Sequence, residues 1–169
     1  TNIGIAPQIS YQYNERTAFY ASLSLHNRKY YKAPDRKSNG FMFTPSIRYF
    51  LDQSSYLSSS IYAGEENSRT EIYGNHSRGF NIAYYKAFNK NINAYLSFNG
   101  SNTDYKGIET AYNQSRNDIS RTLSGTLSYF IKPMNSALSL KLSRTNNSSN
   151  IAMYTYKRNQ IGLDISTNF

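Results

Sequence analysis

The chain carries few of the side chains that usually perform catalysis. It has two histidines, His26 and His76, and no cysteine, and neither histidine lies at a spacing that would hold a metal ion. No glycine-rich phosphate-binding loop is present. A lipid-cleaving hydrolase would need a serine and a histidine paired on the surface that meets lipid, with a third group to orient the histidine. We therefore expect no enzymatic activity, no metal and no cofactor.

The ionisable residues of interest belong instead to a strand pattern. In residues 154–169 the side chains alternate between an apolar and a polar set, as they do when successive residues of a β-strand point to opposite faces. The apolar set is Ile161, Leu163, Ile165, Thr167 and Phe169, and the polar set is Arg158, Gln160, Gly162, Asp164 and Ser166. This segment is predicted to be a strand with one apolar and one hydrated face.

The same alternation recurs along the whole chain. It defines nine segments, near residues 2–13, 17–28, 40–51, 55–66, 77–88, 90–102, 118–131, 135–145 and 154–169. Each is long enough to cross a bilayer as a tilted strand, which takes roughly 9 to 11 residues. No stretch approaches the roughly 20 consecutive apolar residues of a membrane helix.

The composition fits such strands. Only 38% of the 169 residues are hydrophobic and the mean hydropathy is -0.67, yet 15% are aromatic, which argues against disorder. In a membrane barrel half of each strand faces lipid and half faces water, and tyrosines, of which there are 17, collect at the lipid boundaries. We predict an all-β, antiparallel up-and-down transmembrane β-barrel, with residues 1–169 as one barrel domain.

A soluble β-sandwich also alternates and is the competing fold. It does not explain the length of the strands, the Ser, Asn, Thr, Gln and Tyr content of the polar face, or the connections. Short connections are expected near residues 14–15, 52–53, 89 and 133, and long ones near 28–39, 65–76, 102–117 and 146–153. Outer-membrane barrels have short periplasmic turns and long extracellular loops, so the long connections are predicted to lie outside the cell.

The number of segments indicates a larger barrel. Single-chain bacterial barrels have an even number of strands with both ends in the periplasm, whereas nine segments would begin outside the cell. Segment 1 would also leave an open edge in lipid, where unpaired backbone groups find no water. We expect the chain to form the C-terminal strands of a barrel whose remaining strands are its partners.

Six residues of the hydrated face are candidate lumen-lining residues: Arg48, Lys141, Arg158, Asp164, Tyr20 and Tyr62. Ionisable groups inside a membrane protein often mark a transport route. The charged ones are equally compatible with ion-paired scaffolding or with solvation in a wide pore.

A second group of charges lies in the first long connection. The basic residues there are Arg28, Lys29, Lys32, Arg36 and Lys37. With the net charge of +9, they would suit any polyanion, but the basic residues are dispersed. We expect these residues to bind lipopolysaccharide phosphates or nothing specific, in preference to an acidic ligand or nucleic acid.

The end of the chain carries a resemblance. Residues 160–169, Gln-Ile-Gly-Leu-Asp-Ile-Ser-Thr-Asn-Phe, look like the C-terminal signal read by the barrel-assembly machinery. The positions that carry the likeness are Gln160, Gly162, Ile165 and Phe169, and Thr167 departs from it. Residues 149–160, with an Asn-Ile, a Tyr-x-Tyr and a basic-Asn-Gln run, resemble the end of the surface lipoprotein assembly modifier (Slam) family.

The resemblance implies a function that the residues alone do not give. Slam proteins have a periplasmic helical-repeat domain before an outer-membrane barrel and promote delivery of lipoproteins to the cell surface; no helical repeat is present here. It therefore implies a translocator barrel in the bacterial outer membrane, with lipoprotein clients, the barrel-assembly machinery and outer-membrane lipid as partners. A passive or substrate-selective porin and a non-transporting adhesin or structural barrel are the alternatives.

Overall fold

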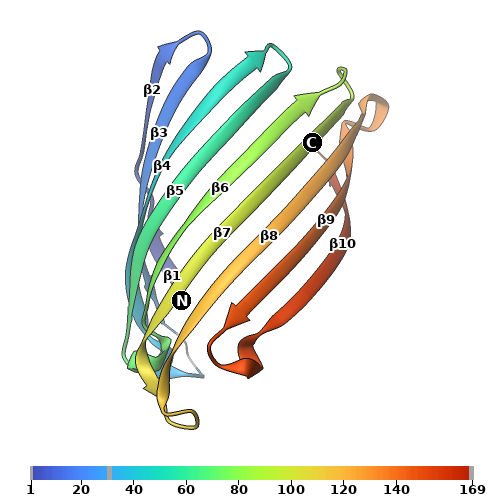
Figure 1. The fold of residues 1–169 in the computed structure, drawn as a ribbon. Helices are drawn as coiled ribbons and strands as arrows, with labels where there is room; N and C mark the ends of the chain where they lie inside the picture. The colour runs from blue at the N-terminus through green and yellow to red at the C-terminus, as the bar shows by residue number, and fades with distance from the viewer. Residues whose placement is uncertain (1, 30–31, 168–169) are drawn as a thin grey trace.

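A computed structural model describes residues 2–29 and 32–167. They form one antiparallel sheet, whose strands follow one another in space as they do in the chain (Figure 1). The strands are β1 (Asn2–Ile5), β2 (Gln8–Asn14), β3 (Thr17–Arg28), β4 (Ser38–Asp52), β5 (Ser55–Ser68), β6 (Asn75–Ala87), β7 (Ile92–Glu109), β8 (Gln114–Ile131), β9 (Ser136–Ser149) and β10 (Tyr156–Thr167). Short 3-10 turns occupy connections: η1 (Pro34–Arg36), η2 (Glu71–Tyr73), η3 (Lys132–Met134) and η4 (Ala152–Tyr154).

The sheet confirms the predicted fold class. Each strand from β3 onward pairs antiparallel with the next, which is the up-and-down order. The sheet is curved but open: within the described residues, β10 pairs only with β9, and no strand joins it to β1 or β2 (Figure 1). No helix in the described part of the chain has the length and apolar content to cross a membrane.

The prediction of nine segments needs one correction. The first segment is two strands, β1 and β2, separated at Ala6 and Pro7, and both pair with β3. Proline has no N–H to donate to a ladder, so the strand is interrupted there. The Pro7 carbonyl still accepts a hydrogen bond from the Leu23 N–H at 3.1 Å, which keeps the two halves in line.

The predicted long connections are too long. On that side β4 to β9 continue past the predicted segment ends, whereas β3 ends at residue 28 as predicted and β10 begins two residues later than predicted. The connections shrink to residues 29–37, 69–74, 110–113 and 150–155. The turn at 110–113 is no longer than the connections 88–91 and 132–135 at the opposite end, so the strict alternation of lengths is wrong at this hairpin. We refer below to the end with residues 15–16 and 53–54 as the turn end and to the other as the loop end.

A second proline lies within a strand. Pro45 belongs to β4 and is the register partner of Ala21 in β3. Toward β5 the ladder has a gap between the pairs Phe43–Ala63 and Ser46–Ser60. The missing donor is thus accommodated by a local break in one ladder.

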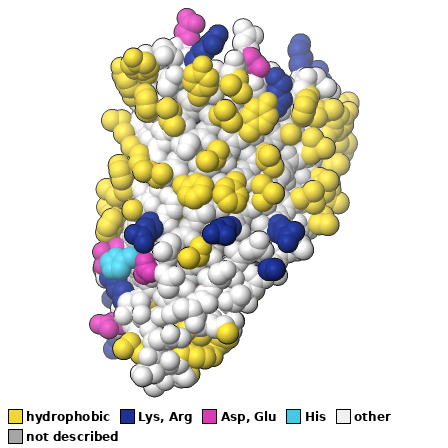
Figure 2. Space-filling view, in the orientation of Figure 1, with side chains coloured by type: hydrophobic (Ala, Val, Ile, Leu, Met, Phe, Trp, Pro, Cys, Tyr) yellow, Lys and Arg dark blue, Asp and Glu magenta, His cyan; other side chains and the backbone are white. Residues whose placement is uncertain are grey.

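The two faces of the sheet differ as the sequence predicted. The apolar set covers the convex face, and no second layer formed by the described residues packs on it, so Leu138, Leu140 and Leu142 are 37%, 37% and 49% exposed. Figure 2 shows hydrophobic side chains spread over this face, with a row of Lys and Arg side chains below them, toward the loop end. A sandwich would bury these leucines, so the soluble alternative is wrong.

The register itself can be tested, because the chain has no cysteine. Ser128 and Ser139 are Cα partners with hydroxyl oxygens 2.8 Å apart on the concave face. The variant S128C/S139C is expected to be joined efficiently by a short thiol-reactive cross-linker, detected as a mobility shift on a denaturing gel. In the control S128C/L138C the second side chain points to the convex face, and efficient cross-linking of that pair would contradict the register.

Candidate functional site: the polar concave face

The concave face is lined mainly by small uncharged polar side chains that pair across strands. Thr122 and Thr145 have hydroxyl oxygens 3.0 Å apart, and Ser128 and Ser139 repeat the arrangement further along the same two strands. Hydroxyl groups both donate and accept, so each can exchange its partner for water or a polypeptide at small cost. The described residues contain no group of three or more His, Cys, Asp or Glu side chains placed to hold a metal ion.

Toward the turn end, one cation is held by aromatic rings. The Arg48 guanidinium carbon lies 5.1 Å from the Tyr20 ring centre and 4.6 Å from that of Tyr56. Tyr56 in turn stacks on Tyr85 at 5.0 Å between ring centres. The Arg48 Nε atom is buried and has no hydrogen-bond partner among the described residues. The structure thus brings predicted residues Arg48 and Tyr20 together, and Tyr56 and Tyr85 are members of the cluster that sequence reasoning missed.

Tyr62 lies on the same face, over a glycine of the neighbouring strand. It is the register partner of Gly79, and a Cβ atom built on Gly79 would lie 2.5 Å from the Tyr62 ring and hydroxyl. Any larger residue at position 79 would have to displace this ring. The absence of a side chain at Gly79 therefore allows the Tyr62 ring to lie close to the backbone of β6.

Near the β10 edge, two of the predicted charges neutralise each other. The Lys141 ammonium is hydrogen-bonded and ion-paired to Asp164, on adjacent strands. Both side chains remain more than half exposed, at 56% and 55%, so the pair is solvated. Arg158 contacts the ring of Tyr156, 5.8 Å from its centre, two residues away on β10. These residues are on the predicted face, and Lys141 and Asp164 have the paired arrangement that the sequence left open.

At the loop end the concave face carries two ion-paired clusters. In the first, Arg28 donates to both carboxylate oxygens of Glu66 at 3.1 and 3.2 Å, and the Ser38 hydroxyl donates to the same group at 2.5 Å. His26 Nε2 lies 4.0 Å from Glu66. Arg28, predicted as the first residue of the basic loop, is thus the last residue of β3 and is bound by a carboxylate.

The second cluster surrounds Arg116, which sequence reasoning placed in a loop. Its guanidinium lies between two rings, 3.7 Å from the centre of Tyr105 and 4.0 Å from that of Tyr154, and its Nε atom is 3.2 Å from Asp118. The Tyr154 hydroxyl donates to Glu109 at 3.0 Å, and this hydrogen bond raises the pKa of the tyrosine. The contacts fasten the β7–β8 hairpin to η4, so the rim is braced at this point.

The other residues of the predicted basic loop are spread over the first connection. Lys29 directly follows β3, Lys32 is exposed, and Lys37 follows η1. Arg36 lies in η1 with its guanidinium carbon 4.7 Å from the ring centre of Tyr73 in η2. The connection is attached to its neighbour through this cation–π contact and through backbone hydrogen bonds from the Thr70 N–H to the Asp35 carbonyl at 3.2 Å and from the Arg69 N–H to the Lys37 carbonyl at 2.8 Å.

The predicted assembly residues lie on β10, at the open edge of the sheet. Gln160 and Gly162 belong to the concave face, and Ile165 belongs to the convex face with 75% of its surface exposed. Phe169 lies outside the described residues. The exposure of this edge leaves its backbone and side chains available to another strand.

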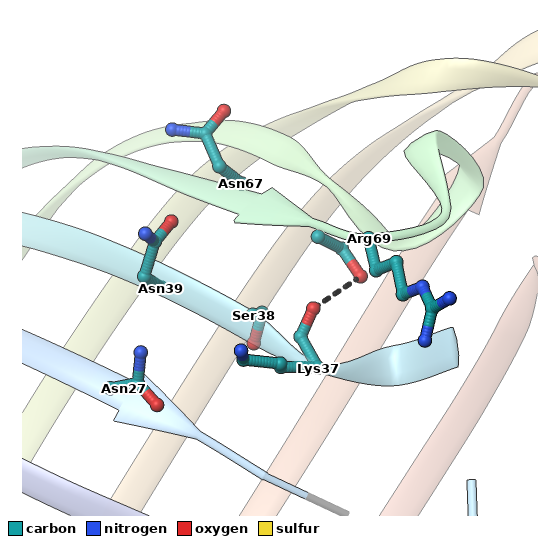
Figure 3. A pocket seen from close by; sticks show the side chains of 7 residues that line it. Asn27, Lys37, Ser38, Asn39, Asn67 and Arg69 are labelled. Carbon is teal, nitrogen blue, oxygen red and sulfur yellow. Dashed lines mark hydrogen bonds between the residues drawn. The ribbon is translucent and has the colours of Figure 1, made fainter. Parts of the chain in front are cut away.

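A shallow pocket on the convex side marks where the apolar surface ends. Asn27, Asn39 and Asn67 are direct partners across β3, β4 and β5 and form a row of amides beside Lys37 and Arg69 (Figure 3). The Arg69 N–H donates to the Lys37 carbonyl at 2.8 Å and closes this end of the pocket. Polar groups thus replace apolar ones on the convex wall toward the loop end.

Together, a single-layer up-and-down sheet, an exposed apolar convex face and a hydroxyl-lined concave face define the wall of a β-barrel. The match to known families is consistent with this class. The model of the family described as surface lipoprotein assembly modifier matches residues 1–169, and the chain belongs to that family. It therefore has a role in surface lipoprotein assembly, which implies the bacterial outer membrane and lipoprotein clients. A comparison with curated proteins found no match.

The cation–π contacts of Arg48 with Tyr20 and Tyr56 are expected to contribute to stability. R48M keeps the length of the side chain and removes its charge, so both cation–π contacts are lost, and the free energy of unfolding should fall by about 1 kcal/mol. Urea unfolding in lipid vesicles, followed by tyrosine fluorescence, measures the change. The control R16M removes an exposed charge at the 15–16 turn, and an equal effect of both substitutions would show that the rings contribute nothing.

Proposed function

We propose that the chain forms part of the wall of an outer-membrane translocator barrel, whose concave face lines a hydrated route by which lipoproteins reach the cell surface. The observation that carries the proposal is the contrast between the two faces of a sheet on which none of the described residues forms a second layer. An apolar face of this size costs free energy in water and gains it in hydrocarbon. The open edges, β10 and β1 with β2, would pair with further strands of the same barrel, because lipid offers their backbone groups no partner.

The orientation follows from the two ends of the sheet. The turn end has the short hairpins expected on the periplasmic side, and the loop end extends beyond the apolar surface, as expected outside the cell. A client coming from the periplasm would first meet Arg48 with its tyrosines and would leave past the clusters at Glu66 and Arg116. The barrel-assembly machinery would read the β10 residues Gln160, Gly162 and Ile165 with Phe169.

The transfer would be physical, with no covalent step. Serine, threonine and asparagine side chains offer an extended polypeptide many weak hydrogen bonds, none strong enough to hold it. The charges on this face are mostly compensated by partners, so a passing chain meets little uncompensated charge. We accordingly propose that the chain has no enzymatic activity.

Membrane embedding can be tested with one residue from each face of β8. Leu127 is convex and 50% exposed, whereas Ser124 is concave. L127R is expected to destabilise the inserted barrel by about 2 kcal/mol, because the charge would face hydrocarbon. Folded protein in outer-membrane fractions, measured by its gel mobility without heating, should fall. The matched variant S124R should insert normally, and equal behaviour of both would argue against a lipid-facing convex surface.

The concave route can be tested through two of its cations. K141Q/R158Q is expected to lower the surface display of a co-expressed lipoprotein several-fold, measured by antibody labelling of intact cells. R16Q/K90Q removes two charges at the turn end and should leave display unchanged. Normal display by the concave variant, with normal amounts of folded barrel, would remove both residues from the route.

A passive porin is the second candidate, because the same hydroxyl lining would conduct small solutes. The two functions differ in planar bilayers. A steady open conductance from the full-length protein would favour the porin, and a closed barrel would favour the translocator.

A further inference from the structure

Three cations gather on the convex face near the loop end. Arg121 of β8 and Lys157 of β10 are both register partners of Asn146, and Arg144 lies two residues from Asn146 on β9. Diagonal neighbours in such ladders are about 7–8 Å apart, so the three form a compact group. We call Arg121, Arg144 and Lys157 the convex basic triangle, and all three are exposed.

No carboxylate balances this charge in the part of the sheet that the structure describes. The direct and diagonal cross-strand neighbours of the triangle, and the next same-face residues on its own strands, are Phe98, Gly100, Asn102, Ile119, Leu123, Gly125, Leu142, Asn146, Ser148, Thr155, Asn159 and Ile161. Other cations of the sheet are paired with carboxylates, for example Lys106 with Glu65 and Arg116 with Asp118. None of the ion pairs among the described residues includes Arg121, Arg144 or Lys157, so the charge of the triangle is available to an anionic ligand.

The triangle lies at the edge of the apolar surface. Toward the turn end, the next convex residue is Leu123 after Arg121 and Leu142 beside Arg144, and Ile161 lies further along β10 from Lys157. Figure 2 shows a row of basic side chains across this face, beneath most of the hydrophobic ones. A ligand that spans the boundary must be anionic on one side and apolar on the other.

We propose that the convex basic triangle binds the phosphate groups of lipopolysaccharide in the outer leaflet. Two guanidinium groups can each hold phosphate oxygens in a bidentate manner, and the lysine adds a point charge. The acyl chains of the same molecule would lie on the leucines and isoleucine next to the triangle. This inference rests on the proposed placement in the outer membrane, and it names the lipid that the convex face would bind there.

The experiment compares variants of the full-length barrel for binding of lipid A in detergent micelles. R121Q/R144Q/K157Q should bind bisphosphorylated lipid A at least about tenfold more weakly than the wild type, because each cation adds to the attraction of an anionic surface. R16Q/K90Q/K132Q removes the same charge at the turn end and should bind as the wild type does. Dephosphorylated lipid A should bind weakly to all three proteins.

Other outcomes would overturn the inference. Equal binding by the wild type and the triangle variant would do so, as would equally strong competition by phosphatidylglycerol vesicles or by inorganic phosphate alone. If the triple variant does not fold, R144Q replaces it, with about a threefold loss expected. Failure of the wild type to insert into vesicles would refute the proposed function, whereas normal insertion with unchanged lipid A binding would refute only the triangle.

Discussion

Backbone pairing between neighbouring strands is the interaction on which the structure depends. In a single layer there is almost no interior, and the buried hydrophobic residues among those described are only Ala18, Ala83 and Ile151. Ladder hydrogen bonds therefore provide the cohesion that a packed core provides elsewhere, and in hydrocarbon they are mandatory. The sequence need only supply strands of period two, and the surroundings of each face decide which side chains are tolerated there.

The two ends of the concave face are stabilised by different interactions. Near the turn end, Arg48 contacts aromatic rings and is not ion-paired with a carboxylate among the described residues. Its positive charge therefore remains on this part of the concave face. At the loop end, Glu66 and Asp118 bind their cations directly. The cation near the turns thus keeps its charge uncompensated by a described carboxylate, whereas the cations bound by Glu66 and Asp118 are neutralised in ion pairs.

The fold could be predicted because the apolar and polar sets alternate strongly over most strands. The same signal fails where both faces are polar. Beyond residue 102, β7 and β8 continue through Thr103, Tyr105 and Arg116, but alternation between two hydrophilic sets leaves no contrast, and the region was predicted to be a loop. The Arg116 cluster was missed for this reason. The Tyr56 contact was missed because it depends on register between strands, which one sequence does not reveal.

The interruption at Pro7 divides the first ladder into two short ones. β1 and β2 pair with β3 through separate short ladders, and the hydrogen bond from the Leu23 N–H to the Pro7 carbonyl lies between them. Within the described part of the chain, each of the two strands pairs only with β3 and carries strongly exposed isoleucines. The edge formed by β1 and β2 is consequently where strands would separate from the sheet at the lowest cost in free energy, one short strand at a time.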